Sequence, residues 1–158
     1  EIRAIAGAGF HSQGIDVSRE DAVTKEDSPA QLHLAGLMKG IADRTQAVVA
    51  ASGEVDIIVS PQDDKAYFLK NGSPSMARIT GTGCMLTCII GTFMAVTSPL
   101  HAAICGAAVL GIAGERADAS RGLGTYHTGL LDQLSLMTDE TLKSEIRLDS
   151  VVLSSTAS

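Results

Sequence analysis

The spacing of apolar residues along the chain predicts its helices and strands. Between residues 28 and 45, leucine, methionine and isoleucine recur every three or four positions, which is typical of a helix. Ser28 and Pro29 are expected at its start, as the N-cap and the first helical residue. Three short apolar runs predict strands at residues 47–51, 55–59 and 66–69. Because residues 47–51 are all apolar, we expect this strand to be buried on both faces.

Helices are expected over most of the second half of the chain. The predicted helices cover residues 84–96, 100–119, 126–137 and 139–147, and a further short helix is expected at residues 1–8. Gly106, Gly111 and Gly114 lie in the second of these segments. Their lack of side chains allows this helix to pack closely on a neighbouring element.

The remaining segments have no helical or strand spacing. Residues 10–27 and 122–125 are expected to be loops, Asn71 and Gly72 a tight turn, and residues 76–79 a short extended segment. Residues 151–158 show no pattern and are expected to form a frayed tail. We therefore expect residues 1–137 to form one portion of a domain, followed by a short helix and tail over 138–158.

The order of these elements predicts the fold class. Strands precede long apolar helices and no internal repeat is visible, so the chain is expected to be α/β, with helices packed against a central sheet. Sheets of this class bind ligands at the carboxyl ends of their strands. Ser52 and Gly53 follow the first predicted strand, and residues 80–84 follow the extended segment. These two places are the expected ligand-binding positions.

Composition excludes several classes of function. The net charge is −6 and the few Lys and Arg residues form no cluster, which argues against a nucleic-acid or membrane-surface role. The longest apolar stretch, residues 102–113, is too short to span a bilayer. Three cysteines without disulfide-scaffold spacing favour a reducing compartment, and we expect the cytoplasm. The four histidines have no metal-ligand spacing.

The glycine-rich segment from Thr80 to Cys84 is the strongest candidate for chemistry. A helix is expected to start there, and its first amides, which lack partners within the helix, form an anion site together with the helix dipole. A cysteine at such a place tends to have a lowered pKa and can accept the proton of an alcohol that attacks a phosphoryl group. The alternative is a buried cysteine that packs beside a tight glycine turn. The segment is not a P-loop, because the Gly-Lys-Ser/Thr ending is absent.

The other two cysteines have simpler interpretations. Cys88 lies four residues after Cys84, so both are expected on one face of a helix, and a metal site is the functional alternative. Because no second pair and no histidine is near, we expect Cys88 to pack. Cys105 lies in an apolar helix and is expected in the core.

Several separate motifs resemble those of one kinase family. Gly81-Thr82-Gly83-Cys84 resembles the anion-hole motif of the ribokinase-like superfamily, in which most sugar kinases carry Asp in place of Cys84. A Cys there is similar to the hydroxyethylthiazole and hydroxymethylpyrimidine kinases. Residues 52–56, Ser-Gly-Glu-Val-Asp, resemble the Thr-Gly-Glu-Val-Asp stretch of the thiazole kinases. Residues 124–126, Gly-Thr-Tyr, resemble their Gly-Ser-Phe, and the likeness runs from Glu1 to about Met137.

This resemblance implies roles for individual residues. Cys84 would be the catalytic base that serves transfer of the γ-phosphate of ATP to 4-methyl-5-(2-hydroxyethyl)thiazole. The anion hole would comprise Gly81, Thr82 and Gly83, with Gly81 also near the thiazole alcohol. The implied ATP contacts are Ser52, Gly53 and Thr80. Glu1 matches the Glu of an Asn-x-x-Glu element that helps position Mg²⁺.

The resemblance also implies an architecture and partners. We expect a ribokinase-like three-layer sandwich with a mostly parallel central sheet, incomplete because the family's amino-terminal portion is missing, and a homotrimer with active sites between subunits. Two alternatives stay open. One is a hydroxymethylpyrimidine or related vitamin-precursor kinase, and the other is an inactive fragment or subunit that requires the missing amino-terminal segment.

Overall fold

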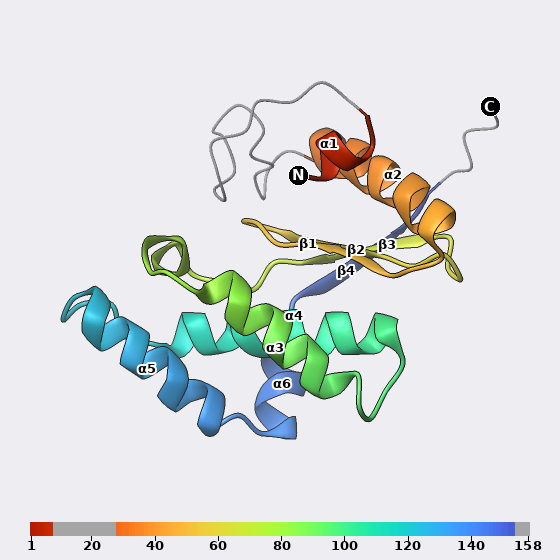
Figure 1. Cartoon of the computed structure of the whole chain (residues 1–158). Helices are drawn as coiled ribbons and strands as arrows, with labels where there is room; N and C mark the ends of the chain where they lie inside the picture. Colours follow the sequence, from red (N-terminus) through yellow and green to blue (C-terminus); the bar gives the residue numbers. More distant parts are fainter. Residues whose placement is uncertain (8–27, 154–158) are drawn as a thin grey trace. The chain divides into compact units, whose positions relative to one another are not determined.

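The computed structural model describes residues 1–7 and 28–153, which fall into two compact units (Figure 1). The first unit takes in residues 1–68 and 149–158, and the second takes in residues 69–148. The expected loop at residues 10–27 lies outside the described residues. The two units separate the predicted strands from most of the predicted helices.

The sheet has four strands in the order β1-β2-β3-β4. The strands are β1 (Val49–Ala51), β2 (Asp56–Val59), β3 (Lys65–Leu69) and β4 (Leu148–Val152). β1 pairs with β2 in antiparallel register, with Ala50 opposite Ile58. The connection between β2 and β3 spans only residues 60–64, and parallel neighbours need a crossover of a dozen residues or more. These two strands are therefore antiparallel as well.

The last strand also runs antiparallel to its neighbour. The Lys70 amide donates to the Arg147 carbonyl at 3.0 Å, and the Leu153 amide donates to the Asp64 carbonyl at 2.8 Å. Residue numbers rise along β3 while those of its partners fall along β4, which defines an antiparallel ladder. The expected mostly parallel sheet is thus not found among the described strands. The connections from β1 to β2 and from β2 to β3 are too short for crossovers, and the hydrogen bonds between β3 and β4 make that pair antiparallel despite its long connection.

Two details of the strands differ from the prediction. β1 is an edge strand with Ala50 exposed, so the prediction that it is buried on both faces is wrong. Val151 and Val152, expected in a frayed tail, belong to β4, while residues 154–158 lie outside the described part. Both differences arise from strand order, which depends on pairing between distant segments.

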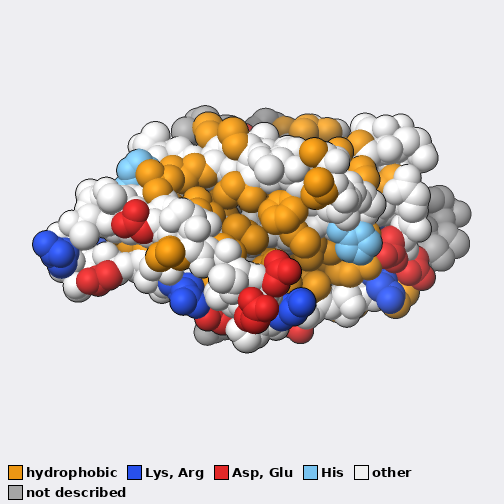
Figure 2. Space-filling view, turned by 90° about the horizontal axis from the view of Figure 1, so that it is seen from below, with side chains coloured by type: hydrophobic (Ala, Val, Ile, Leu, Met, Phe, Trp, Pro, Cys, Tyr) orange, Lys and Arg blue, Asp and Glu red, His pale blue; other side chains and the backbone are white. Residues whose placement is uncertain are grey.

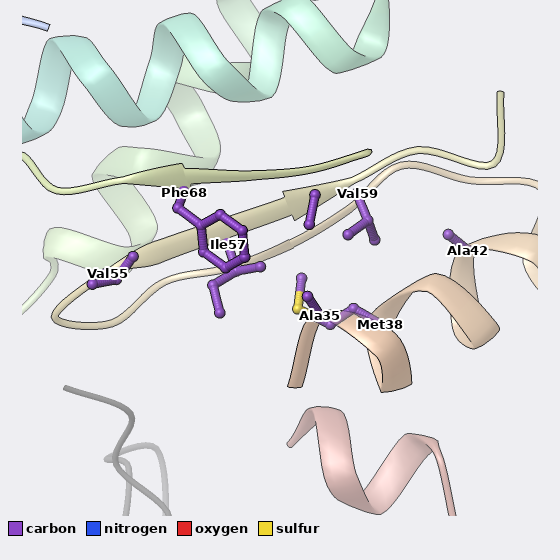
Figure 3. Packing of buried hydrophobic residues seen from close by; sticks show 8 residues of the cluster. Ala35, Met38, Ala42, Val55, Ile57, Val59 and Phe68 are labelled. Atoms are coloured by element: carbon purple, nitrogen blue, oxygen red, sulfur yellow. The ribbon is translucent and has the colours of Figure 1, made fainter. Parts of the chain in front are cut away.

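Helix α2 (Ser28–Thr45) covers the sheet and forms the core of the first unit (Figure 3). Ala35, Met38 and Ala42, spaced three and four apart, bring one helix face against the apolar side chains of the strands. The strand side contributes Val55, Ile57, Val59, Ala66 and Phe68. Ser28 is itself helical, whereas the sequence predicted it to be the N-cap. Helix α1 (Ile2–Ile5) contributes Ile2 to the edge of this core.

The second unit is built around one buried helix. Its helices are α3 (Thr82–Phe93), α4 (Pro99–Arg116), α5 (Leu123–Ser135) and α6 (Asp139–Glu145). Residues 102–114 of α4 are buried almost throughout, and α3, α5 and α6 contact this helix. The close packing predicted for the α4 glycines is confirmed, since Gly106, Gly111 and Gly114 touch Ile90, Asn71 and Met76.

Two short segments of this unit differ from the prediction. Pro74–Arg78 forms a 3₁₀ helix, η1, where residues 76–79 were expected to be extended. The Ser73 hydroxyl accepts from the Ser75 amide and Pro74 occupies the first turn, which explains why a helical turn starts there. The predicted loop at 122–125 is also shorter than expected, because α5 already begins at Leu123.

Apolar side chains remain exposed on the second unit. Figure 2 shows hydrophobic side chains gathered in the middle of one face, with charged side chains mostly near its margin. The large exposed apolar residues of this unit include Met94, Val96, Leu131 and Leu136. Within residues 1–7 and 28–153, every helix is too short or too polar to cross a membrane.

Candidate active site at the start of helix α3

Helix α3 begins two residues before Cys84. Gly81 is the N-cap and adopts φ 97°, in the left-handed region that a side chain disfavours. The first bond of the helix runs from the Met85 amide to the Gly81 carbonyl at 2.9 Å. The amides of Thr82, Gly83 and Cys84 therefore precede the helical ladder, and Cys84 lies in the first turn. This arrangement is suited to an anion, because amides and helix dipole both favour negative charge.

The turn is held in place by the elements beneath it. The Thr82 hydroxyl donates to the Met76 carbonyl at 3.5 Å, which ties the first helical residue to η1. Met76 in turn packs on Gly114 of α4, and the Tyr126 hydroxyl donates to the Gly114 carbonyl at 2.8 Å. Ile79, just before the turn, joins the apolar cluster of this unit. A packed core thus fixes where the first amides of α3 point.

The surface over this turn is open. Cys84 is exposed, and a side chain added at Gly81 or Gly83 would meet no heavy atom within 4 Å. The alternative of a buried, packing Cys84 is therefore wrong. Thr80 is exposed as well. A bulky anionic group has room to approach the amides and the thiol together.

The other two cysteines differ from each other. Cys88 is exposed, so the prediction that it packs is wrong. Its neighbours on the helix, Met85 and Ile89, pack toward the core, whereas the Cys88 side chain stays exposed. Cys105 is half-buried, and burial raises the pKa of its thiol, in keeping with an inert cysteine at the edge of the core.

The candidate ATP contacts Ser52 and Gly53 lie in the first unit. Both are exposed and follow the end of β1, as expected from the sequence. The Gly53 amide donates to Asp56 Oδ1 at 3.0 Å, so this carboxylate stabilises the turn. Asp56 thereby has a structural role. The roles of Ser52 and Gly53 toward ATP stay predictions.

Glu1, the candidate magnesium residue, is exposed at the start of α1. Its carbonyl accepts from the Ile5 amide at 3.0 Å. No group of three or more His, Cys, Asp and Glu side chains suited to a metal ion exists within the described ranges. Magnesium bound to a nucleotide takes one or two carboxylates and otherwise phosphates and water, so a single exposed carboxylate such as Glu1 fits that donor set.

A polar cluster around the buried Asn71 was not predicted. Asn71 is 5% exposed, and its Nδ2 donates to Glu115 Oε2 at 3.2 Å and to the Glu145 carbonyl at 3.0 Å. Its Oδ1 accepts from the Arg147 amide at 2.8 Å. The Gly72 amide donates to Glu115 Oε1 at 2.6 Å. Asn71 and Gly72 are therefore an anchor that joins α4, α6 and the segment before η1, where the sequence suggested only a tight turn.

Comparisons with known proteins place the chain in a family. The model of the hydroxyethylthiazole kinase family matches residues 1–140. Hydroxyethylthiazole kinase 2 of Methanosphaera stadtmanae is 41% identical over 154 residues, covering 90% of this chain and 52% of the relative. Hydroxyethylthiazole kinase 2 of a Clostridium botulinum strain is 33% identical over 150 residues, covering 95% of this chain and 55% of the relative.

A solved structure agrees with these relatives. The hydroxyethylthiazole kinase protein of Pyrococcus horikoshii OT3 matches with a TM-score of 0.68 and 28% identity, over 81% of this chain and 53% of that chain. The chain thus spans about half the length of the relatives that it matches. On the evidence of the family model and these likenesses, the chain belongs to the hydroxyethylthiazole kinase family.

Proposed function

We propose that the chain forms the phosphoryl-transfer part of a hydroxyethylthiazole kinase, which transfers the γ-phosphoryl group of ATP to 4-methyl-5-(2-hydroxyethyl)thiazole in thiamine biosynthesis or salvage. One observation carries the proposal. In a member of this family, an exposed thiol lies in the first turn of a helix whose leading amides precede the helical ladder and whose first glycines have open space beside them. Such a turn stabilises the negative charge that a phosphoryl group carries during transfer.

The proposed mechanism uses the start of α3. The amides of Gly81, Thr82 and Gly83 hold the oxygens of the migrating phosphoryl group, with Gly81 also near the thiazole alcohol. As that alcohol attacks the γ-phosphorus, the Cys84 thiolate takes its proton, the new P–O bond forms, and the bond to the leaving ADP breaks. Cys84 then carries the proton as a thiol and must lose it before the next turnover.

The nucleotide requires further contacts. We propose Ser52, Gly53 and Thr80 as ATP contacts, since all three are exposed and have backbone or hydroxyl groups suited to phosphate oxygens. Glu1 is the residue that we propose to help hold Mg²⁺, whose charge offsets that of the phosphates.

The proposal extends to the complete protein. The family's remaining length would complete a ribokinase-like three-layer sandwich with a mostly parallel sheet and, as a cytoplasmic homotrimer, the active sites between subunits. The chain covers about half of its relatives, and strand β1 is an apolar edge, so we propose that activity requires the segment outside the match.

A fusion of this chain with the unmatched part of a relative, here called the joined protein, tests this function. The part of the M. stadtmanae relative outside the match would be fused to this chain, and ATP-dependent phosphorylation would be measured with the thiazole alcohol, with the hydroxymethylpyrimidine alcohol and without an alcohol. We expect product with the thiazole alcohol and little with the pyrimidine. A joined protein that folds but prefers the pyrimidine, or phosphorylates neither, contradicts the proposed substrate. Robust turnover by the 158-residue chain alone contradicts the need for the other segment.

A further inference from the structure

Two exposed cysteines lie one helical turn apart on α3. Cys84 and Cys88 are both exposed and four residues apart within a continuous helix. The helix is regular here, because the Thr87 hydroxyl donates to the Gly83 carbonyl at 3.1 Å and the Thr92 hydroxyl donates to the Cys88 carbonyl at 3.0 Å. Residues at this spacing are neighbours on one face, with Cβ atoms about 5–6 Å apart. The two sulfur atoms can therefore bind one small group between them.

Helix α3 carries no charged side chain around this pair. A side chain added at Gly83 or Gly91 would meet no heavy atom within 4 Å, so space is open at both ends of the pair. Thr87, between the two cysteines, is exposed, and α3 contains no acidic or basic residue. The large apolar side chains of α3 pack toward the core instead. A reagent of moderate size has room to reach both thiols.

The number of ligands limits what can bind. The described part of the chain holds no cluster of three metal-ligating side chains, and a structural zinc ion takes four. This pair suits a group that binds two protein sulfur atoms and already carries a third substituent of its own. Trivalent organoarsenicals have this chemistry, since arsenic keeps one bond to carbon and forms two to sulfur.

We infer that Cys84 and Cys88 form a dithiol site for trivalent organoarsenicals. The reaction involves no change of oxidation state: an arsine oxide and two thiols give one cyclic dithioarsenite and one water molecule, as two As–S bonds replace the As–O bonds and both thiol protons leave in the water. Because Cys84 is the proposed catalytic base, occupancy of the site removes kinase activity. That consequence rests on the proposed function, whereas the binding itself does not.

The test uses phenylarsine oxide and the 158-residue chain, followed by intact-mass measurement. We expect one adduct, with the mass of the reagent less one water molecule, that survives excess glutathione and is removed by a dithiol such as 2,3-dimercaptopropanol. Cys88→Ser, a conservative change at an exposed position, should weaken binding about 100-fold or more, because the second sulfur no longer acts at high effective concentration. Cys105→Ser is the matched control and should bind as the unaltered chain does.

Several outcomes overturn the inference. They are an adduct on the unaltered chain that glutathione removes, a glutathione-resistant adduct that survives Cys88→Ser, or loss of the adduct with Cys105→Ser. Circular dichroism of each variant establishes that its helices are intact. Because no outcome depends on turnover, a failed kinase assay and a failed arsenical assay remain distinguishable.

Discussion

Replacing Gly111 by alanine tests how closely α4 must approach the segment before the active-site turn. The new Cβ would lie 2.8 Å from Asn71 Cβ, 3.0 Å from its carbonyl carbon and 3.1 Å from its carbonyl oxygen. Carbon atoms in contact normally lie about 3.5–4.0 Å apart. Two of these atoms are backbone, and the Asn71 side chain is held by three hydrogen bonds, so neither can move away freely.

The expected change in the free energy of unfolding is the sum of two destabilising effects and one stabilising effect. Overpacking of this kind costs about 1–3 kcal/mol. Removal of a glycine from a helix interior stabilises by about 0.5–1 kcal/mol. A shift of Asn71 that breaks one of its buried hydrogen bonds adds about 1 kcal/mol. We therefore expect Gly111→Ala to lower the free energy of unfolding by about 2 kcal/mol, which corresponds to about 4–8 °C in Tm for a chain of this size.

Urea and thermal unfolding followed by far-ultraviolet circular dichroism measure this difference. Gly91→Ala is the matched control in the same unit, since its new Cβ would meet no heavy atom within 4 Å, and it should stabilise α3 by about 0.5–1 kcal/mol. If Gly111→Ala is as stable as Gly91→Ala, the close contact between α4 and Asn71 does not exist as described.

Two further predictions concern tyrosine hydroxyls. Tyr126→Phe removes the donor to the Gly114 carbonyl and should destabilise the chain by about 1–2 kcal/mol, measured by urea unfolding; an unchanged midpoint contradicts the bond. The Tyr67 hydroxyl donates to Asp63 Oδ2 at 2.6 Å and holds the pKa of that carboxyl below its ordinary value. This contribution to stability is present above the unfolded-state pKa of about 3.9 and is lost as pH falls through the lower folded-state pKa. Tyr67→Phe should therefore destabilise the chain more at pH 6 than at pH 2.5, and an equal effect at both pH values contradicts the assignment.

Local signals in the sequence predicted most elements of the fold. The helical spacing of leucine, methionine and isoleucine in residues 28–45 and the short runs of the first three strands placed those elements to within a few residues. Ser73 and Pro74 carry the same Ser-Pro start signal that marks the helices at Ser28 and Ser98, so η1 was predictable in principle. The extended prediction for residues 76–79 overlooked it.

Features that depend on distant partners were not predicted. β4 exists because residues near 148 pair with β3, and its five exposed residues show no alternation that would reveal a strand. Asn71 is buried because Glu115 and the residues after α6 surround it, although locally it resembles a turn residue. The exposure of Cys88 follows from which face of α3 packs. The spacing of Met85 and Ile89 indicates that face once the helix is known.

The candidate site was predicted from the Gly-Thr-Gly-Cys motif more than from the spacing of apolar residues. Glycines before an apolar helix indicate an anion site, and the structure has that helix, its left-handed Gly81 cap and an exposed Cys84. The contacts of ATP and Mg²⁺ depend on more than the described residues, since the chain matches only about half the length of its relatives. These roles therefore remain proposals.

The most direct test of the central claim compares the unaltered joined protein with its Cys84→Ala variant. The rate of thiazole phosphorylation and the affinity for ATP are measured on the same samples. We expect the rate to fall by about 10²- to 10⁴-fold, the usual contribution of a general base, while ATP binds with nearly unchanged affinity. Cys84→Asp should restore a substantial part of the rate, because a carboxylate can accept the same proton. A Cys84→Ala protein that phosphorylates the thiazole at the original rate contradicts the account.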